Sequence, residues 1–159
     1  MEDFAVPKRE VNVRVLLEDG RDLSGLMYVP AIGPDGGPGQ LIDQLNQEAN
    51  DFLVLRESQK AHVIREALIL TVAVLEDSVE ERVEQQIEDS VGGRHLLVKL
   101  HLTSGAEILG NLSYVQPLER ERLQDFLNTR PRFVPLRVHK KLVYVNRLQI
   151  VSAVALRGE

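Results

Sequence analysis

The four histidines are the side chains of this sequence best suited to acid–base catalysis or metal binding, and their spacing favours neither. They are His62, His95, His101 and His139. No pair has the His-Glu-x-x-His spacing of a helical zinc site, and no histidine–carboxylate pair is repeated along the chain. The 159 residues include no cysteine, which excludes thiolate catalysis, cysteine-ligated zinc and disulfides. We therefore expect no enzyme, no metal site and no cofactor.

A glycine-rich segment is the one candidate for a phosphate-binding loop. Residues 33–39 read Gly-Pro-Asp-Gly-Gly-Pro-Gly. A loop that cradles phosphate continues into Lys followed by Ser or Thr, and this segment does not. Its composition predicts a flexible surface loop, either a tolerated insertion or, less favoured, a binding loop.

A basic cluster is the strongest candidate for a ligand site. Its members, with His139 nearby, are Arg130, Arg132, Arg137, Lys140 and Lys141. Such a cluster could bind an anion such as RNA or a nucleotide through phosphate contacts. Aromatic residues make up only 4% of the chain, which disfavours base stacking. The alternative is that these side chains face acidic residues of the same chain.

The distribution of charge supports that alternative. Residues 1–75 carry a net charge of −5, residues 76–89 carry −6, and residues 90–159 carry +6, for a total of −5. Halves of opposite sign can attract each other within one chain or head to tail between chains.

The elements that position these residues recur along the chain. Val11–Gly20 matches Leu96–Gly105 in its alternation of apolar residues and its closing glycine. The later matches, in the same order, are Leu23–Met27 with Ile108–Leu112, Leu41–Asn46 with Leu123–Asn128, Phe52–Leu55 with Phe133–Leu136, and Leu68–Val74 with Leu148–Val154. Five matched blocks predict a tandem duplication.

Each copy has the pattern of a small β unit with one short helix. In the first copy we expect strands near 11–18, 22–30, 51–56, 61–66 and 67–75 and a helix at 41–46; in the second, strands near 96–102, 106–115, 132–137, 140–146 and 147–156 and a helix at 123–128. Gly25 and Gly110 predict a bulge or a sharp bend in the second strand of each copy. Ser78 begins a connecting acidic helix. The expected domains are 1–75, the connecting helix within 76–93, and 94–159.

The last strand of each copy predicts an interface. Ala67–Leu75 and Leu148–Leu156 contain no charged residue, which is typical of strands covered on both faces. In the second copy, alternation places four residues on the second face: Gln149, Val151, Ala153 and Ala155. This face is too apolar for open solvent, so we expect the other copy, the connecting helix or another subunit to cover it.

Two resemblances accompany these patterns. Three segments are similar to an uncharacterised bacterial domain family marked by Leu-x-Asp-x-Leu-Asn, a Phe-x-x-Leu strand and a Val-Asn-Lys-x-x-Ile strand: Arg122–Asn128, Phe133–Leu136 and Val143–Ile150. The resemblance implies a fold and a bacterial origin, but no activity. More distantly, Val13–Val29 and Val143–Val154 resemble the two motifs of Sm-like small β-barrels. The Arg-Gly of the Sm nucleobase pocket is missing from both copies.

The predicted fold is therefore mainly β: a tandem duplication of a small five-stranded Sm/SH3-like barrel unit, with a short helix in each copy and a connecting helix. No apolar stretch is long enough to span a bilayer, and the acidic N-terminus lacks a secretory signal pattern, so we expect a cytoplasmic protein. The predicted function is a non-catalytic interaction or assembly module with a protein partner or with itself. The alternative is anion binding by the basic second copy.

Overall fold

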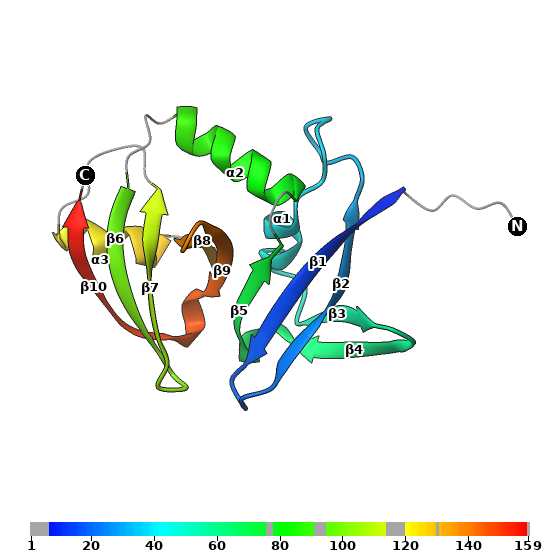
Figure 1. The fold of residues 1–159 in the computed structure, drawn as a ribbon, viewed down its shortest axis with the longest axis horizontal. Coiled ribbons are helices and arrows are strands. Elements are labelled where there is room, and N and C mark those ends of the chain that lie inside the picture. Colours follow the sequence, from blue (N-terminus) through cyan, green and yellow to red (C-terminus); the bar gives the residue numbers. More distant parts are fainter. Residues whose placement is uncertain (1–6, 76–77, 91–94, 114–119, 130, 159) are drawn as a thin grey trace, which may run out of the picture.

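The computed structural model is mainly β, as the sequence predicts. The structure describes residues 7–75, 78–90, 95–113, 120–129 and 131–158. Within these ranges ten strands form one antiparallel, unclosed sheet, accompanied by three α-helices and two short 3-10 helices (Figure 1).

The elements fall into an N-terminal half, a connecting helix and a C-terminal half. The N-terminal half contains β1 (Lys8–Leu17), β2 (Asp22–Pro30), α1 (Leu41–Leu45), β3 (Phe52–Glu57), β4 (Lys60–Arg65), η1 (Glu66–Leu68) and β5 (Ile69–Val74). Helix α2 (Val79–Ser90) connects it to β6 (His95–Leu102), β7 (Glu107–Ser113), α3 (Arg120–Thr129), β8 (Phe133–Val138), β9 (Lys141–Asn146), η2 (Arg147–Gln149) and β10 (Ile150–Gly158) of the C-terminal half. The closing strands, expected to start at residues 67 and 147, begin only after a 3-10 turn.

The strand order is the same in the two halves. The whole sheet runs β10-β6-β7-β8-β9-β5-β1-β2-β3-β4. The N-terminal half alone therefore has the order β5-β1-β2-β3-β4, and the C-terminal half has β10-β6-β7-β8-β9. The two halves are joined where β5 pairs with β9. Strands β4 and β10 consequently form the two edges of the sheet.

Gly20 and Gly105 close the first hairpin of each half. Their φ angles are +96° and +92°, in the left-handed region that glycine enters without steric cost. Gly20 N donates to Leu17 O at 3.0 Å, and Gly105 N donates to Leu102 O at 2.9 Å. The predicted tight turns are thus confirmed in both halves.

Gly25 and Gly110 are needed for close strand approach rather than for a bulge. A Cβ at Gly25 would lie 2.3 Å from the carbonyl oxygen of Arg56 in β3, and one at Gly110 would lie 2.6 Å from that of Arg137 in β8. The β1·β2 and β6·β7 pairings pass both glycines without a shift of register. Of the predicted bulge or sharp bend, the bulge is therefore excluded at both glycines: glycine lets the next strand cross at these two points.

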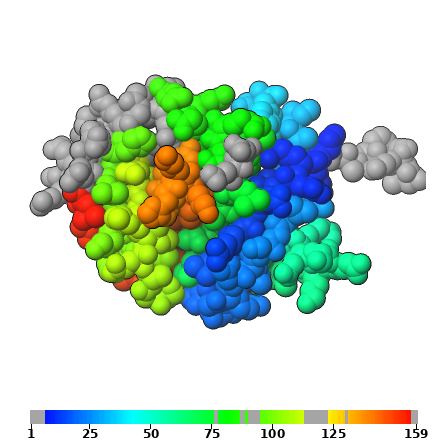
Figure 2. All heavy atoms as spheres, viewed as in Figure 1, coloured from blue at the N-terminus to red at the C-terminus, as the bar shows by residue number. Residues whose placement is uncertain are grey.

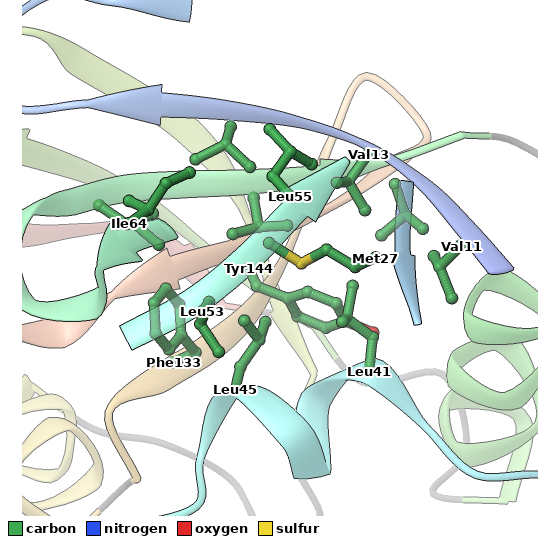
Figure 3. Close-up of a cluster of buried hydrophobic side chains, with 14 of the residues drawn as sticks. Val11, Val13, Met27, Leu41, Leu45, Leu53, Leu55, Ile64, Phe133 and Tyr144 are labelled. Carbon is green, nitrogen blue, oxygen red and sulfur yellow. The ribbon is translucent and has the colours of Figure 1, made fainter. Parts of the chain in front are cut away.

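Two hydrophobic clusters form the core, and each half contributes side chains to the cluster of the other. The N-terminal cluster includes Phe133, Leu142 and Tyr144 from β8 and β9 (Figure 3). The C-terminal cluster includes Leu70 from β5. Burial of apolar area is the main stabilising term in folding, so this exchange couples the stability of the halves.

Helix α2 is tied to both halves through its first turn. Ser78 Oγ accepts a hydrogen bond from Glu81 N at 3.1 Å, which confirms the predicted N-cap. The buried carboxylate of Glu80 accepts from Leu41 N at 3.0 Å in the N-terminal half. Glu81 accepts from Leu142 N at 2.9 Å in the C-terminal half. These two glutamates of the acidic helix thus hold backbone amides instead of facing solvent.

Candidate interaction surfaces

The pairing of β5 with β9, here called the inner joint, is the contact against which the other surfaces can be compared. Its ladder consists of three residue pairs: Thr71 with Val145, Val72 with Tyr144, and Ala73 with Val143. A ladder of three pairs is short, so the side chains around it must add specificity.

Asn46 extends the inner joint beyond the strands. Its Nδ2 donates to Phe133 O at 3.3 Å, and its Oδ1 accepts from Phe133 N at 2.7 Å. The amide side chain thus bonds the backbone as a neighbouring strand would. It satisfies both polar groups at the start of β8.

A buried ion pair closes one end of the inner joint. Arg132 Nη1 lies 2.6 Å from Glu66 Oε1, and the Glu66 side chain is fully buried. Glu66 Oε2 has no hydrogen-bond partner among the described residues. Burial raises the pKa of the Glu66 carboxyl above its ordinary value, and the Arg132 guanidinium opposes that rise. The joint therefore contains one costly charge, compensated by one arginine.

Two amide side chains from the end of β9 and from η2 complete the joint. Asn146 Nδ2 donates to Ile69 O at 2.8 Å and to Glu66 O at 3.2 Å. Gln149 Nε2 donates to Ala67 O at 2.6 Å, and the Gln149 side chain is buried. Gln149 is thus covered by the N-terminal half, which is one of the three covers expected from the sequence. Its placement on the closing strand is wrong, because Gln149 belongs to η2.

The outer edge of β10 is apolar and has no neighbouring strand among the described residues, but its exposed side chains do not follow the predicted pattern. Its pairing with β6 shifts register at Val151 and again at Leu156. Each shift inserts one residue and breaks the alternation of faces. Ala153 and Ala155 consequently pack against the C-terminal cluster, whereas Val151, Val154 and Leu156 are exposed. Of the four predicted interface residues, Val151 alone is an exposed side chain, with 66% of its surface accessible.

The outer edge of β4 carries a second apolar surface, which sequence reasoning missed. Val63 is 65% exposed and lies opposite Val54 of β3, which is also exposed. Phe52 is 47% exposed, and the Arg65 guanidinium lies 4.5 Å from its ring centre. The β3–β4 hairpin projects from the body of the molecule (Figure 2). The signal in the sequence is strand alternation. Neighbouring residues of a strand point to opposite faces, so a buried Ile64 places Val63 on the other, exposed face.

The predicted basic cluster is divided in the structure. Arg132 and Arg137 lie at opposite ends of β8, about 16 Å apart at the rise of an extended strand. Arg132 pairs with Glu66 and Arg137 pairs with Glu81, so both face acidic side chains of the same chain. Lys140 and Lys141 lie exposed at the β8–β9 turn, and Arg130 lies outside the described residues.

One groove gathers part of this cluster. It has a volume of about 790 Å³, and its polar lining consists of Glu81, Gln85, His95, Asn111, Arg137, His139 and Lys140. His95 Nδ1 is buried without a hydrogen-bond partner among the described residues. The groove can therefore offer cationic and imidazole groups to a small polar ligand, but it contains no nucleophile positioned beside a base.

Comparison with known proteins does not assign a function to this chain. No protein-family model, curated protein or solved structure matches it. In the described ranges, no helix combines the length and apolar character needed to cross a membrane. No group of three or more metal-ligating side chains could hold a metal ion within the same ranges.

Proposed function

We propose that this protein is a non-catalytic interaction and assembly module that associates through its two sheet edges and the apolar side chains beside them. The observation that carries the proposal is that β4 and β10 have no strand on their outer sides among the described residues, while Val63 and Val151 are each about two-thirds exposed. An open edge offers N–H and C=O groups to another strand, and apolar side chains beside it add burial.

The devices that usually protect a sheet edge are sparse here. Natural edge strands are commonly blocked by proline, by charged side chains, by β-bulges or by a covering element. Strand β4 has charged residues only at its ends, Lys60 and Arg65, and no proline. Strand β10 has neither a charged residue nor a proline from Ile150 to Leu156, although its pairing with β6 shifts register at Val151 and at Leu156. Both edges therefore suit strand addition.

The predicted tandem origin belongs to this proposal. We infer that the halves are copies of one five-stranded Sm/SH3-like unit; the common strand order and the matching turn glycines support this. Two such units have four edges. The inner joint uses β5 and β9, and β4 and β10 are left for partners.

Site-specific photo-crosslinking tests the proposed function. A photo-crosslinking amino acid is placed at position 63 or 151, and at position 109 as the control. Leu109 is a matched control because it is 49% exposed but lies on β7, inside the sheet. We expect covalent protein adducts from positions 63 and 151 and not from 109. The absence of adducts at both edges would overturn the proposal.

Anion binding is a second candidate, favoured by the groove that contains Arg137, Lys140 and His95, whose Nδ1 has no hydrogen-bond partner in the part of the chain that the structure describes. Fluorescence anisotropy with single-stranded RNA tests it. Binding should weaken with salt, at a log–log slope of about −0.7 per phosphate contact. Absence of binding at low salt would exclude this function.

A further inference from the structure

We infer that the partner at both edges is a second copy of this chain, added head to tail so that β10 of one molecule pairs with β4 of the next. The inference rests on the proposed function and commits it to one partner. The inner joint is the template for this contact. Strand β4 has the same position in the N-terminal half as β9 in the C-terminal half, and β10 has the same position in the C-terminal half as β5 in the N-terminal half.

Residue positions in the two halves correspond one to one near these strands. Elements β8, β9 and η2 start at residues 133, 141 and 147, each 81 residues after β3, β4 and η1, which start at 52, 60 and 66. The β1·β5 pairing shifts register at Leu70, and the β6·β10 pairing shifts at the matching place, at Val151. The sequence match of Leu68–Val74 with Leu148–Val154 is therefore wrong by one residue, because the structure sets Leu70 against Val151. Strand β5 pairs with β9 despite this irregularity, so the matching irregularity leaves β10 able to pair as well.

The side chains that cross the inner joint have exposed counterparts at the outer edges. Phe133, Tyr144 and Leu70 enter the cluster of the opposite half and are at most 2% exposed. Their counterparts, in the same order, are Phe52, Val63 and Val151, which are 47%, 65% and 66% exposed. Apolar groups at these positions are covered when a neighbouring unit is present, and a second copy brings such a unit to each edge.

The polar contacts of the inner joint also have counterparts, with the charges exchanged. At the joint, Arg132 of the C-terminal half pairs with Glu66 of the N-terminal half. The matching positions are Asp51 in the N-terminal half and Arg147 in the C-terminal half. Pairing of β10 with β4 would therefore again bring an acid and an arginine together. Asn46, which bonds the first residue of β8 at the joint, follows α1; Asn128, its match in the sequence, is exposed in the last turn of α3.

The template fixes the register of the intermolecular pairing. Carried over from the joint, it places Ala153 of one molecule opposite Val63 of the next, and Ser152 opposite Ile64. A contact between two different surfaces continues until it closes into a ring or extends as a filament. Because each molecule of the natural chain has both edges, we expect it to form assemblies larger than a dimer.

Disulfide trapping tests this register, and the natural chain is cysteine-free. The variants Val63→Cys and Ala153→Cys are prepared separately, checked for folding by circular dichroism, and oxidised with oxidised glutathione alone and as a mixture. Residues directly opposite in an antiparallel pair lie within the Cα distance that a disulfide spans. Each variant alone controls for edge pairing with itself, and Leu109→Cys mixed with Val63→Cys controls for random collision.

We expect a disulfide-linked dimer from the Val63→Cys and Ala153→Cys mixture and from no control. A chain that carries both substitutions should give a ladder of linked species, because each molecule can then be linked at both edges. Light scattering of the natural chain should give a mass above the 17.9 kDa of one copy. A single-copy mass at high concentration together with no mixed disulfide would overturn the inference. Photo-crosslinks from positions 63 and 151 to a different protein would contradict self-association but support the proposed interaction function. Failure of the inference can therefore be told apart from failure of the proposed function.

Discussion

The inner joint and the outer edges place matching side chains in opposite environments. Phe133 begins β8 and is buried in the core of the other half, whereas Phe52 begins β3 and is half exposed. Leu70 is buried across the joint, whereas Val151 is open to solvent. The difference teaches that matching positions are buried where the two halves meet and exposed where no second unit is present. Residues of the inner joint stabilise the molecule, and under the proposed function their exposed counterparts serve a partner.

Truncation of the two phenylalanines should show the largest contrast. We expect Phe133→Ala to lower the free energy of unfolding by about 3–5 kcal/mol, because it removes a fully buried aromatic side chain. Phe52→Ala should cost no more than about 1 kcal/mol, mainly through loss of the contact with Arg65. Urea unfolding of both variants, under dilute conditions that keep the chain unassociated, measures the contrast. Equal losses would mean that the two positions are not in different environments.

Removal of the joint arginine should have the next largest effect. Arg132→Ala leaves the Glu66 carboxylate buried without its cation, at a cost of about 1–3 kcal/mol. Arg147→Ala, at the matching position, should change stability by no more than about 0.5 kcal/mol in the unassociated chain. Thermal unfolding compares the variants. A cost at Arg147 as large as that at Arg132 would contradict the assignment of Arg147 to an open edge.

The acid of the same pair should give the joint a pH dependence. Because burial raises the pKa of Glu66, the folded protein binds this proton more tightly than the unfolded chain does. Stability relative to a Glu66→Gln variant should therefore be greatest below the ordinary glutamate pKa and fall as pH rises through the raised value. Melting temperatures of both proteins from acidic to neutral pH measure this trend. The prediction is contradicted if the melting temperature of the natural protein rises relative to that of Glu66→Gln as pH increases.

The smallest expected effect concerns the edge charges. Asp51→Lys should weaken self-association by about 1.4- to 5-fold, the range for an exposed ion pair. The melting temperature of the dilute chain should not fall, because the negative charge of Asp51 helps to raise the pKa of the buried Glu66 and its removal relieves that repulsion. Arg147→Asp in the same chain should restore the association. Sedimentation velocity measures each variant. If the double variant is no better than the single one, Asp51 does not face Arg147 across the contact.

The sequence was sufficient to predict local structure, because the signals are local. Alternating apolar residues predicted the strands, Gly20 and Gly105 predicted the turns, and Ser78 predicted the start of the connecting helix, all within a few residues. These patterns depend on backbone preference and on the periodicity of one element.

The parts that could not be predicted depend on contacts between distant segments. Simple alternation groups Ala153 and Ala155 with Val151, but the register shift at Val151 turns the two alanines toward the C-terminal cluster while Val151 stays exposed. Gln149 is buried because it reaches Ala67 O, 82 positions away. The basic cluster was read as one surface, although partners on η1 and α2 divide it. Which strands become edges also follows only from the β5·β9 pairing, which no periodicity reveals.

Amide hydrogen exchange at the sheet edges tests the central claim most directly, that the edges of this chain pair with each other. Exchange in β4 and β10 is followed from dilute to concentrated protein, with the β5·β9 amides as the internal reference. The account expects both edge strands to gain protection together as concentration rises, while protection at the inner joint stays constant. Exchange at β4 and β10 that is independent of concentration would contradict it.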